Sequence, residues 1–106
     1  MDTLDRSTAD EYAGWFAALA DGTRIQIVSL LARSRRSLTV GEITAAVGVG
    51  QSTVSHHLKI LADVRFVLVE QRGTRRLYRV NDACVECFPS AADVVMGKPA
   101  PAAPAD

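Results

Sequence analysis

The stretch Gly50-Gln-Ser-Thr-Val-Ser-His-His-Leu-Lys-Ile-Leu61 decides the fold of this chain. Its apolar residues recur every three or four positions, at Val54, Leu58 and Leu61, which is the spacing of one face of an α-helix. This spacing predicts a helix over residues 52–64 whose apolar face lies in the core. The opposite face carries hydroxyls, an imidazole and an ammonium group but no carboxylate: Ser52, Ser55, His56 and Lys59.

The residues after this stretch change from a helical period to a period of two. The runs Phe66-Val-Leu-Val-Glu70 and Arg76-Leu-Tyr-Arg-Val80 are rich in the β-branched and aromatic side chains that are typical of strands. The segment between them, Arg72-Gly-Thr-Arg75, contains the glycine that a tight turn favours. We therefore expect a β-hairpin with a strongly basic tip.

Two helices are predicted before residue 35. The first has one apolar face, formed by Tyr12, Trp15, Phe16 and Leu19. Asp21-Gly22 ends this helix, and Asp21 can cap the second one. The second helix is apolar on nearly every side, so we expect it to be central and buried, with Ile25, Ile27, Val28, Leu30 and Leu31 inside. The run Arg33-Ser-Arg-Arg-Ser37 ends it.

A short third helix comes directly before the deciding stretch. Thr39-Val-Gly-Glu42 has the form of a capping box, which predicts a helix start. Val40, Ile43 and Val47 would then point inward, and the glycines at 48 and 50 would end the helix in a tight corner. Two helices joined by such a corner are what a helix-turn-helix requires.

A last helix is predicted from about Ala83. Phe88-Pro89 leaves two alternatives, because a residue before proline is pushed away from helical angles: a helix through both cysteines, or a turn that holds them before a helix from Pro89 to Met96. The order α-α-α-α-β-β-α is a mainly α fold with a β-hairpin wing, a winged helix-turn-helix. We expect residues 1–97 to form this domain and the Pro/Ala-rich residues 98–106 to be a disordered tail.

The composition is that of one small globular domain, with 106 residues, 48% hydrophobic and 23% charged. No apolar stretch reaches the roughly 18 residues that cross a bilayer. The acidic N-terminus has no signal-peptide run, so we expect a cytoplasmic protein with no membrane partner. The formal net charge of zero hides a basic block, because residues 22–81 carry ten basic against three acidic side chains. Such a block predicts a polyanionic partner.

The basic block and the polar helix face together predict a surface that reads double-stranded DNA. A helix of hydrogen-bonding groups without carboxylates fits the major groove, and arginines at a hairpin tip suit phosphate or minor-groove contacts. The predicted DNA-binding residues are Gln51, Ser52, Thr53, Ser55, His56, Lys59, Arg72, Thr74, Arg75 and Arg76. The alternatives are a solvated helix face, arginines that guard an exposed edge strand, and a module that docks an acidic protein.

The two adjacent histidines do not predict a metal site. Neighbouring side chains on a helix point about 100° apart, so His56 and His57 cannot bind one ion together. His57 borders the apolar face, which predicts a packed or capping histidine. His56 is expected to contact the groove.

Three segments resemble the ArsR/SmtB family of bacterial metal-sensing repressors. They are Ala17-Ala-Leu-Ala-Asp-Gly-Thr-Arg-Ile25, the deciding stretch from Gly50 to Leu61, and Arg72-Gly-Thr-Arg-Arg-Leu-Tyr-Arg79. The resemblance covers about residues 10–88. It implies a homodimer joined through the first and last helices, which binds a palindromic operator and is released from it by an inducer.

The resemblance also implies where an inducer could bind. Many arsenic sensors of the family have Cys-Val-Cys at the start of the third helix, where this chain has Thr39-Val40-Gly41, so that site is absent. Zinc, cobalt and nickel sensors place Asp-x-His at the start of the last helix. Here Asp82-Ala83-Cys84 stands there, the later positions Val94 and Val95 are apolar, and no later histidine follows. A hard-metal site of that design is not expected.

The remaining sensor is the pair Cys84 and Cys87, whose Cys-x-x-Cys spacing brings two thiols within reach of one ion. Soft thiolates favour thiophilic inducers, first arsenite or antimonite and then cadmium, lead or zinc, with cuprous ion a further candidate. Two thiols are too few for tetrahedral zinc and one short of the three that arsenite prefers. A partner subunit would supply the rest, or the pair would hold an organoarsenical.

Two other roles for the cysteines remain open. One is a thiol-based redox switch through a disulfide between them, and the other is a pair of small packed residues. An enzyme is not expected. A thiol oxidoreductase would need a βαβ pattern, and the chain has no P-loop, no Gly-x-Gly-x-x-Gly and no nucleophile beside a base.

Overall fold

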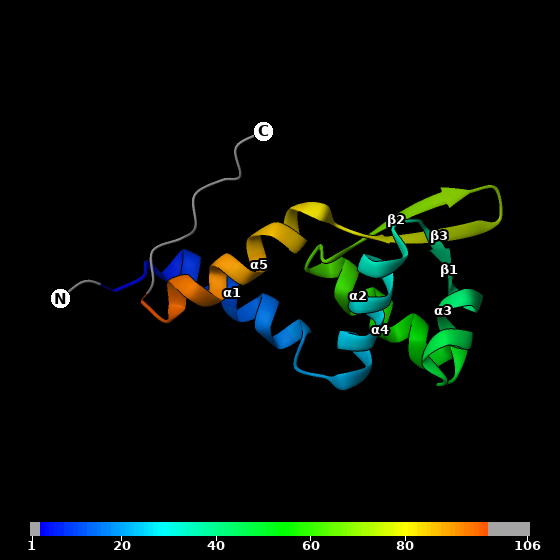
Figure 1. Cartoon of the computed structure of the whole chain (residues 1–106), viewed down its shortest axis with the longest axis horizontal. Coiled ribbons are helices and arrows are strands. Elements are labelled where there is room, and N and C mark those ends of the chain that lie inside the picture. The colour runs from blue at the N-terminus through cyan, green and yellow to red at the C-terminus, as the bar shows by residue number, and fades with distance from the viewer. Residues whose placement is uncertain (1–2, 98–106) are drawn as a thin grey trace.

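The structure, a computed structural model, describes residues 3–97, and within the last helix it gives the backbone but not the side chains of residues 84–90. Five helices and three strands follow one another as α1 Arg6–Ala18, α2 Gly22–Ser34, β1 Leu38–Thr39, α3 Val40–Val47, α4 Gln51–Asp63, β2 Val67–Arg72, β3 Arg75–Val80 and α5 Asp82–Val95 (Figure 1). This order confirms the predicted winged helix-turn-helix and adds the short strand β1. No helix in the described part is long and apolar enough to span a membrane.

Side-chain caps fix the starts of four helices. Asp5 and Asp21 accept hydrogen bonds from the backbone N–H groups of Thr8 and Arg24, at the starts of α1 and α2. Asn81 does the same for α5. Each cap satisfies an N–H group that has no partner inside its helix, typically stabilising it by about 1 kcal/mol. The Asp21 cap was predicted from the sequence, and the structure confirms it.

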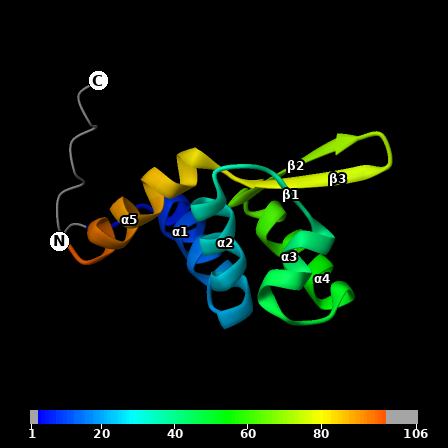
Figure 2. The same cartoon turned by 45° about the vertical axis from the view of Figure 1, so that its right-hand side comes forward.

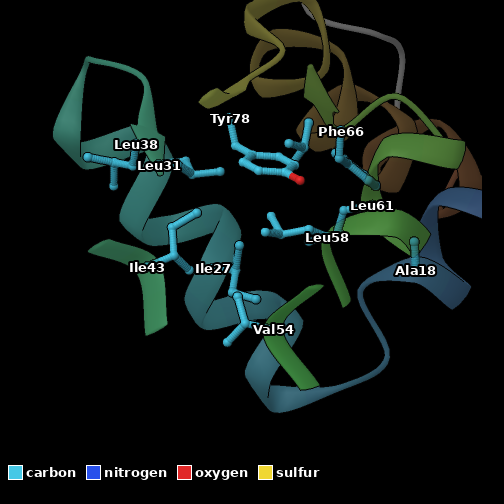
Figure 3. Close-up of a cluster of buried hydrophobic side chains, with 11 residues drawn as sticks. Ala18, Ile27, Leu31, Leu38, Ile43, Val54, Leu58, Leu61, Phe66 and Tyr78 are labelled. Atoms are coloured by element: carbon cyan, nitrogen blue, oxygen red, sulfur yellow. The ribbon is translucent and has the colours of Figure 1, made fainter. Parts of the chain in front are cut away.

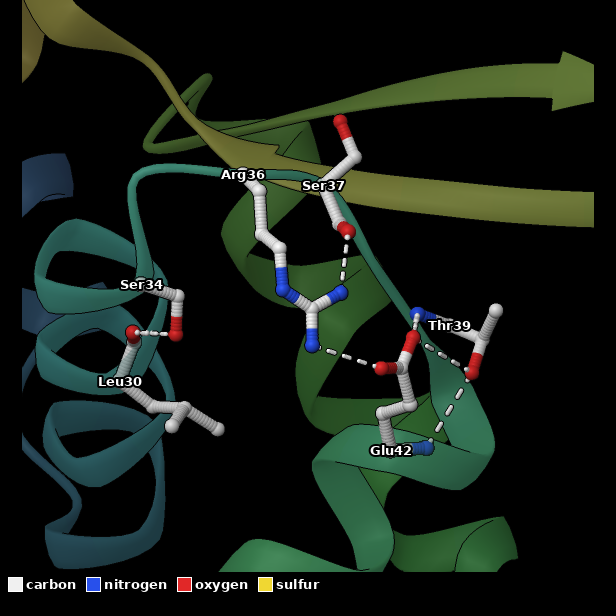
Figure 4. Close-up of polar contacts among 6 residues, drawn as sticks. All are labelled: Leu30, Ser34, Arg36, Ser37, Thr39 and Glu42. Atoms are coloured by element: carbon white, nitrogen blue, oxygen red, sulfur yellow. Dashed lines mark hydrogen bonds and ion pairs between the residues drawn. The ribbon is translucent and has the colours of Figure 1, made fainter.

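The start of α3 is the predicted capping box. The backbone N–H of Glu42 donates to the Thr39 hydroxyl at 3.2 Å, and the Glu42 carboxylate accepts from the Thr39 N–H at 3.1 Å (Figure 4). Arg36 closes on the same carboxylate at 2.9 Å. The hydrogen bond from Arg36 is the main cause that lowers the pKa of Glu42, and the Thr39 N–H adds to it.

The core lies where α2, α3 and α4 meet the base of the wing. Figure 3 shows side chains from these three helices directed at one another, with Phe66 and Tyr78 closing the cluster on the side of the sheet. The most deeply buried large side chains are Ile27, Leu31, Ile43, Val54, Leu58, Leu61 and Val67, all at most 1% exposed. Burial of each such side chain stabilises the fold by about 1.5–3 kcal/mol. The three predicted inward positions of α4 are all in this set.

The wing is an antiparallel sheet in the order β1-β3-β2. Arg72 pairs with Arg75, so Gly73 and Thr74 form a two-residue turn, and Gly73 adopts the positive φ of 60° that glycine favours. Strand β1 pairs Leu38 with Tyr78 and Thr39 with Leu77. Two residues are too few to show a strand period, so the sequence did not predict β1.

The structure corrects two burial predictions. Ile25 is 52% exposed, where it lines a surface cavity with Ala46 and Val47 of α3, and Phe16 is 38% exposed on α1. The remaining predicted inward residues of α2 are buried or half-buried. Apolar periodicity marks which residues could enter a core, but the packing of one chain covers only part of a helix that is apolar all round.

The last helix is continuous from Asp82 to Val95. The alternative of a turn that holds both cysteines before Pro89 is therefore wrong, and both cysteines lie on α5. Figures 1 and 2 both place α1 and α5 together at one end of the molecule, with the wing at the opposite end. The α5 end carries exposed apolar side chains, with Val95 50% and Met96 77% exposed.

Candidate DNA-binding surface

The outer face of α4 presents polar side chains with nothing to bind in the described chain. Its inner face is held by Val54, Leu58 and Leu61, each fully buried, so the helix cannot rotate about its axis without exposing them. The six predicted reading residues are all exposed: Gln51, Ser52, Thr53, Ser55, His56 and Lys59. Apart from a ring contact between His56 and His57, none of the six side chains has a hydrogen bond or ion pair with the described residues.

The corner between α3 and α4 sets the angle at which this face is presented. Gly48 ends α3 with a left-handed φ of 75°, and its N–H donates to the carbonyl of Thr44. Val49 packs against the core, and Gly50 then takes the extended conformation that begins α4. The predicted glycine corner is thus present, and it brings the start of α4 to the surface.

The wing adds arginines beside this helix. Ser55 and Lys59 of α4 line one cavity of about 460 Å³ with Arg76 and Val69 of the wing, and Leu58 also lines it. Neither Lys59 nor Arg76 has an ion-pair partner among the described residues. Two predicted residues of the helix and one of the wing therefore meet in a single cleft with two free cations.

A second cleft lies at the turn of the wing. Thr74, Arg75 and Arg76 line a cavity of about 410 Å³ with Thr39 and Gly41 at the start of α3. Together the two clefts follow the same side of the wing, because Arg76 lines both. Thr39 and Gly41 were not among the predicted DNA contacts, since their sequence signal is that of a helix cap.

The structure does not place Arg72 with these free cations. Its Nε donates to the Glu70 carboxylate at 3.0 Å, so its charge is partly compensated. Both side chains are well exposed, and exposed pairs of this kind are worth only about 0–1 kcal/mol. Gln51, Ser52 and Thr53 do not line either cleft, and they are presented at the first turn of α4 instead.

The predicted sensor lies outside what can be described. The side chains of Cys84 and Cys87 are not among the described residues, and only their place on α5 is given. Within the described part of the chain, no three His, Cys, Asp or Glu side chains come together to hold a metal ion.

Two helices joined by a tight corner, with a β-hairpin beside the second, define a winged helix-turn-helix protein. The family described as "Bacterial regulatory protein, arsR family" matches residues 21–68. The chain is 37% identical over 82 residues to the arsenical resistance operon repressor of Bacillus subtilis, and the alignment covers 77% of each protein. This chain belongs to the ArsR family of bacterial regulators, and the resemblance found in the sequence is confirmed.

Two further comparisons agree with the family and the fold. The transcriptional repressor SmtB homolog of Synechocystis is 36% identical over 81 residues, which cover 76% of this chain but 60% of that relative's length. The homodimeric winged helix-turn-helix DNA-binding domain Mb0332 from Mycobacterium bovis has 32% identity and a TM-score of 0.70, over 92% of this chain and 90% of that one. These relatives are transcriptional regulators rather than enzymes.

Proposed function

We propose that this chain is a transcriptional repressor that binds operator DNA as a homodimer and leaves it when a thiophilic metal or metalloid binds Cys84 and Cys87. The observation that carries the DNA-binding part is the row of exposed, unpartnered polar side chains on α4 beside the free cations Lys59 and Arg76. Polar groups without partners and without nearby carboxylates suit base edges and phosphates.

In the complex, α4 enters the major groove. The six residues of its outer face contact base edges and nearby phosphates, from Gln51 in the first turn to Lys59. The wing contacts the backbone or the minor groove through Arg72, Thr74, Arg75 and Arg76. Arg72 contributes least, because binding a phosphate would require it to leave Glu70.

The second protomer joins through α1 and α5. The exposed Val95 and Met96 lie at this end, and a domain of about 100 residues with a thin core gains stability by covering such side chains. The related Mb0332 domain is itself homodimeric. Two-fold symmetry would then place the two reading helices about one DNA turn, on the order of 34 Å, apart.

The inducer acts through the two cysteines on α5. Positions three apart on a helix share a face, with Cβ atoms about 5–6 Å apart, which lets both sulfurs reach one ion. A disulfide needs Cβ atoms about 3.5–4.5 Å apart, so it would require the helix to distort. This difference favours a thiophilic ion over the alternative redox switch. The arsenical repressor of B. subtilis is a related protein. Arsenite and antimonite therefore come first, before cadmium, lead and zinc.

The test is fluorescence anisotropy of the reduced protein on its own upstream DNA. Wild type is titrated with arsenite, cadmium and zinc beside a Cys84→Ser/Cys87→Ser variant. Release of wild type but not of the variant by one ion supports the sensor and identifies its inducer. If only oxidation releases wild type from DNA, the cysteines act as a redox switch and the metal-sensor proposal is wrong. A plot of the logarithm of the DNA affinity against the logarithm of the salt concentration should have a slope on the order of −5. An affinity that does not change with salt would argue against binding to DNA phosphates.

A further inference from the structure

One charged network joins the end of α1, the start of α2 and the inner edge of α4. The Nε of Arg24 donates to the carbonyl oxygen of Ala18, the last residue of α1, at 2.6 Å. Its Nη1 lies 3.2 Å from Nδ1 of His57 on α4. Arg24 and His57 are 33 residues apart in the sequence, and the His57 side chain is only 12% exposed. One guanidinium therefore ties two helices together at a half-buried place.

The partners of His57 define which of its nitrogens carries the proton. Arginine is only a donor, so Nδ1 must accept, and the proton of the neutral ring is then on Nε2. Nε2 faces the Asp21 carboxylate, whose Oδ1 is 3.9 Å away. Asp21 is itself held by the backbone N–H of Arg24, which is the main cause that lowers its pKa, and the charge of Arg24 adds to it.

The place of His57 on α4 gives this network a consequence for DNA reading. His57 lies between the inner positions Val54 and Leu58 and the outer face that carries His56 and Lys59. A hydrogen bond to its ring therefore acts on the same helix that carries the reading side chains. The buried apolar residues fix how deeply α4 packs, but they are non-directional. A hydrogen bond is directional, so the contact from Arg24 adds a constraint on the tilt of α4 relative to α1.

We propose that Arg24 is a positioning residue for α4: by holding the carbonyl of Ala18 and Nδ1 of His57 at once, it fixes the reading helix relative to α1 and carries any movement of α1 to the DNA surface. This inference rests on the proposed DNA-binding function and deepens it. Nε and Nη1 of Arg24 are directed at the α1 end and at His57, so we do not expect Arg24 to contact DNA in this arrangement.

The experiment measures binding of full-length protein to operator DNA and to an unrelated duplex of equal length, across a salt series. The main variant is Arg24→Met, which keeps the apolar stem and removes the guanidinium. Arg33→Met is the matched control, because Arg33 is on the same helix, is exposed and bonds only to the Ser29 hydroxyl among the described residues. Circular dichroism at the assay temperature confirms that each variant is folded.

For Arg24→Met we expect an operator affinity lower by on the order of tenfold, within the range that one misread base pair costs. Affinity for the unrelated duplex and the salt slope should stay near those of wild type, and Arg33→Met should match wild type throughout. A slope weaker by about 1.8, which is two phosphates per dimer, would overturn the proposal by making Arg24 a direct phosphate contact. An operator affinity of Arg24→Met equal to that of wild type would also overturn the proposal, because Arg24 would then only stabilise the fold.

A second pair of variants tests the His57 side of the contact. His57→Asn keeps an acceptor near the place of Nδ1 and should retain most of the operator affinity, whereas His57→Leu should lose as much as Arg24→Met. The double variant Arg24→Met/His57→Leu should lose little more than either single one, because both remove the same contact. Additive losses would overturn the proposal. If wild type itself bound no duplex, the proposed function would fail rather than this inference.

Discussion

At the scale of single residues, the surroundings of Arg76 differ from those of Arg79, which lies three positions later on the same strand. Both are exposed residues of β3. Arg76 lines the cleft with Ser55 and Lys59, whereas Arg79 lines a cavity of about 590 Å³ at the end of α2, with Arg35 and Asp82. The strand thus presents two arginines to different surroundings, and only one of them lies beside the reading helix.

This difference predicts that removing the charge of Arg76 weakens DNA binding more than removing the charge of Arg79. Arg76→Ala should weaken operator binding and reduce the salt slope by about 1.8, one phosphate contact in each protomer. Arg79→Ala removes the same charge from the same strand and should change the slope much less. Anisotropy titrations over a salt series measure both. Equal effects would mean that net charge, not the cleft, determines the affinity.

The ionisation of Glu42 makes the stability of the fold depend on pH. Its folded-state pKa is lowered from 4.5 by the hydrogen bonds from Arg36 and Thr39, so its ionised form stabilises the folded state. That contribution is fully present above the unfolded value and is lost as the pH falls through the lower folded one. Glu42→Gln should therefore be less stable than wild type at pH 6, and the gap should close in acid. Urea unfolding of both proteins across this pH range measures the difference in their free energies of unfolding. A difference that stays constant with pH would contradict the prediction.

At the scale of elements, the wing depends on one backbone conformation. Gly73 has a φ of 60°, and a Cβ placed there would meet no atom within 4 Å, so any cost of substitution is conformational and not steric. The turn is also what sets the pairing of Arg72 with Arg75, and hence which strand residues face α4.

Gly73→Ala should accordingly lower the free energy of unfolding by about 1 kcal/mol, which lowers Tm by about 4–8 °C. Gly73→Asn should cost less, because asparagine tolerates positive φ better than alanine. Thermal unfolding followed by circular dichroism compares the three proteins. Equal melting temperatures for all of them would show that the turn is not held at this φ in solution.

At the scale of the whole molecule, the two ends have different surfaces. The wing and α4 lie at one end, and α1 and α5 lie at the other (Figure 2). The wing end carries the free cations Lys59 and Arg76, and α5 ends at the exposed Val95 and Met96. A repressor that reads a palindrome needs both, because each protomer alone contacts half a site. The Arg24 network runs between them, from the end of α1 to α4.

The proposed dimer surface predicts a change of oligomeric state. Val95→Glu should convert the dimer to monomer and weaken operator binding strongly, because two like charges would meet across the two-fold axis. Ile25→Glu is the matched control: it places the same charge on an equally exposed apolar position of α2 and should remain a dimer. Sedimentation velocity measures both. Dissociation of the Ile25 variant instead would move the interface to α2.

Several features could be predicted from the amino-acid sequence alone. They are the order of the main helices and strands, the hairpin, the caps Asp21 and Thr39, the buried face of α4, and the family. These features depend on neighbours within a few positions, and a local period or motif records them. The sequence also selected the outer face of α4 as the candidate reading surface, because polar residues at helical spacing opposite an apolar face must point outward.

The contacts between distant segments could be seen only in the folded chain. In the structure β1 pairs with β3, Ile25 is exposed, α5 includes both cysteines before Pro89, Arg72 binds Glu70, and Arg76 lies with Lys59. The structure also joins Arg24 to His57, for which no sequence signal exists. These outcomes depend on how helices and sheet pack against one another, and packing chooses among residues that a local pattern treats as equivalent.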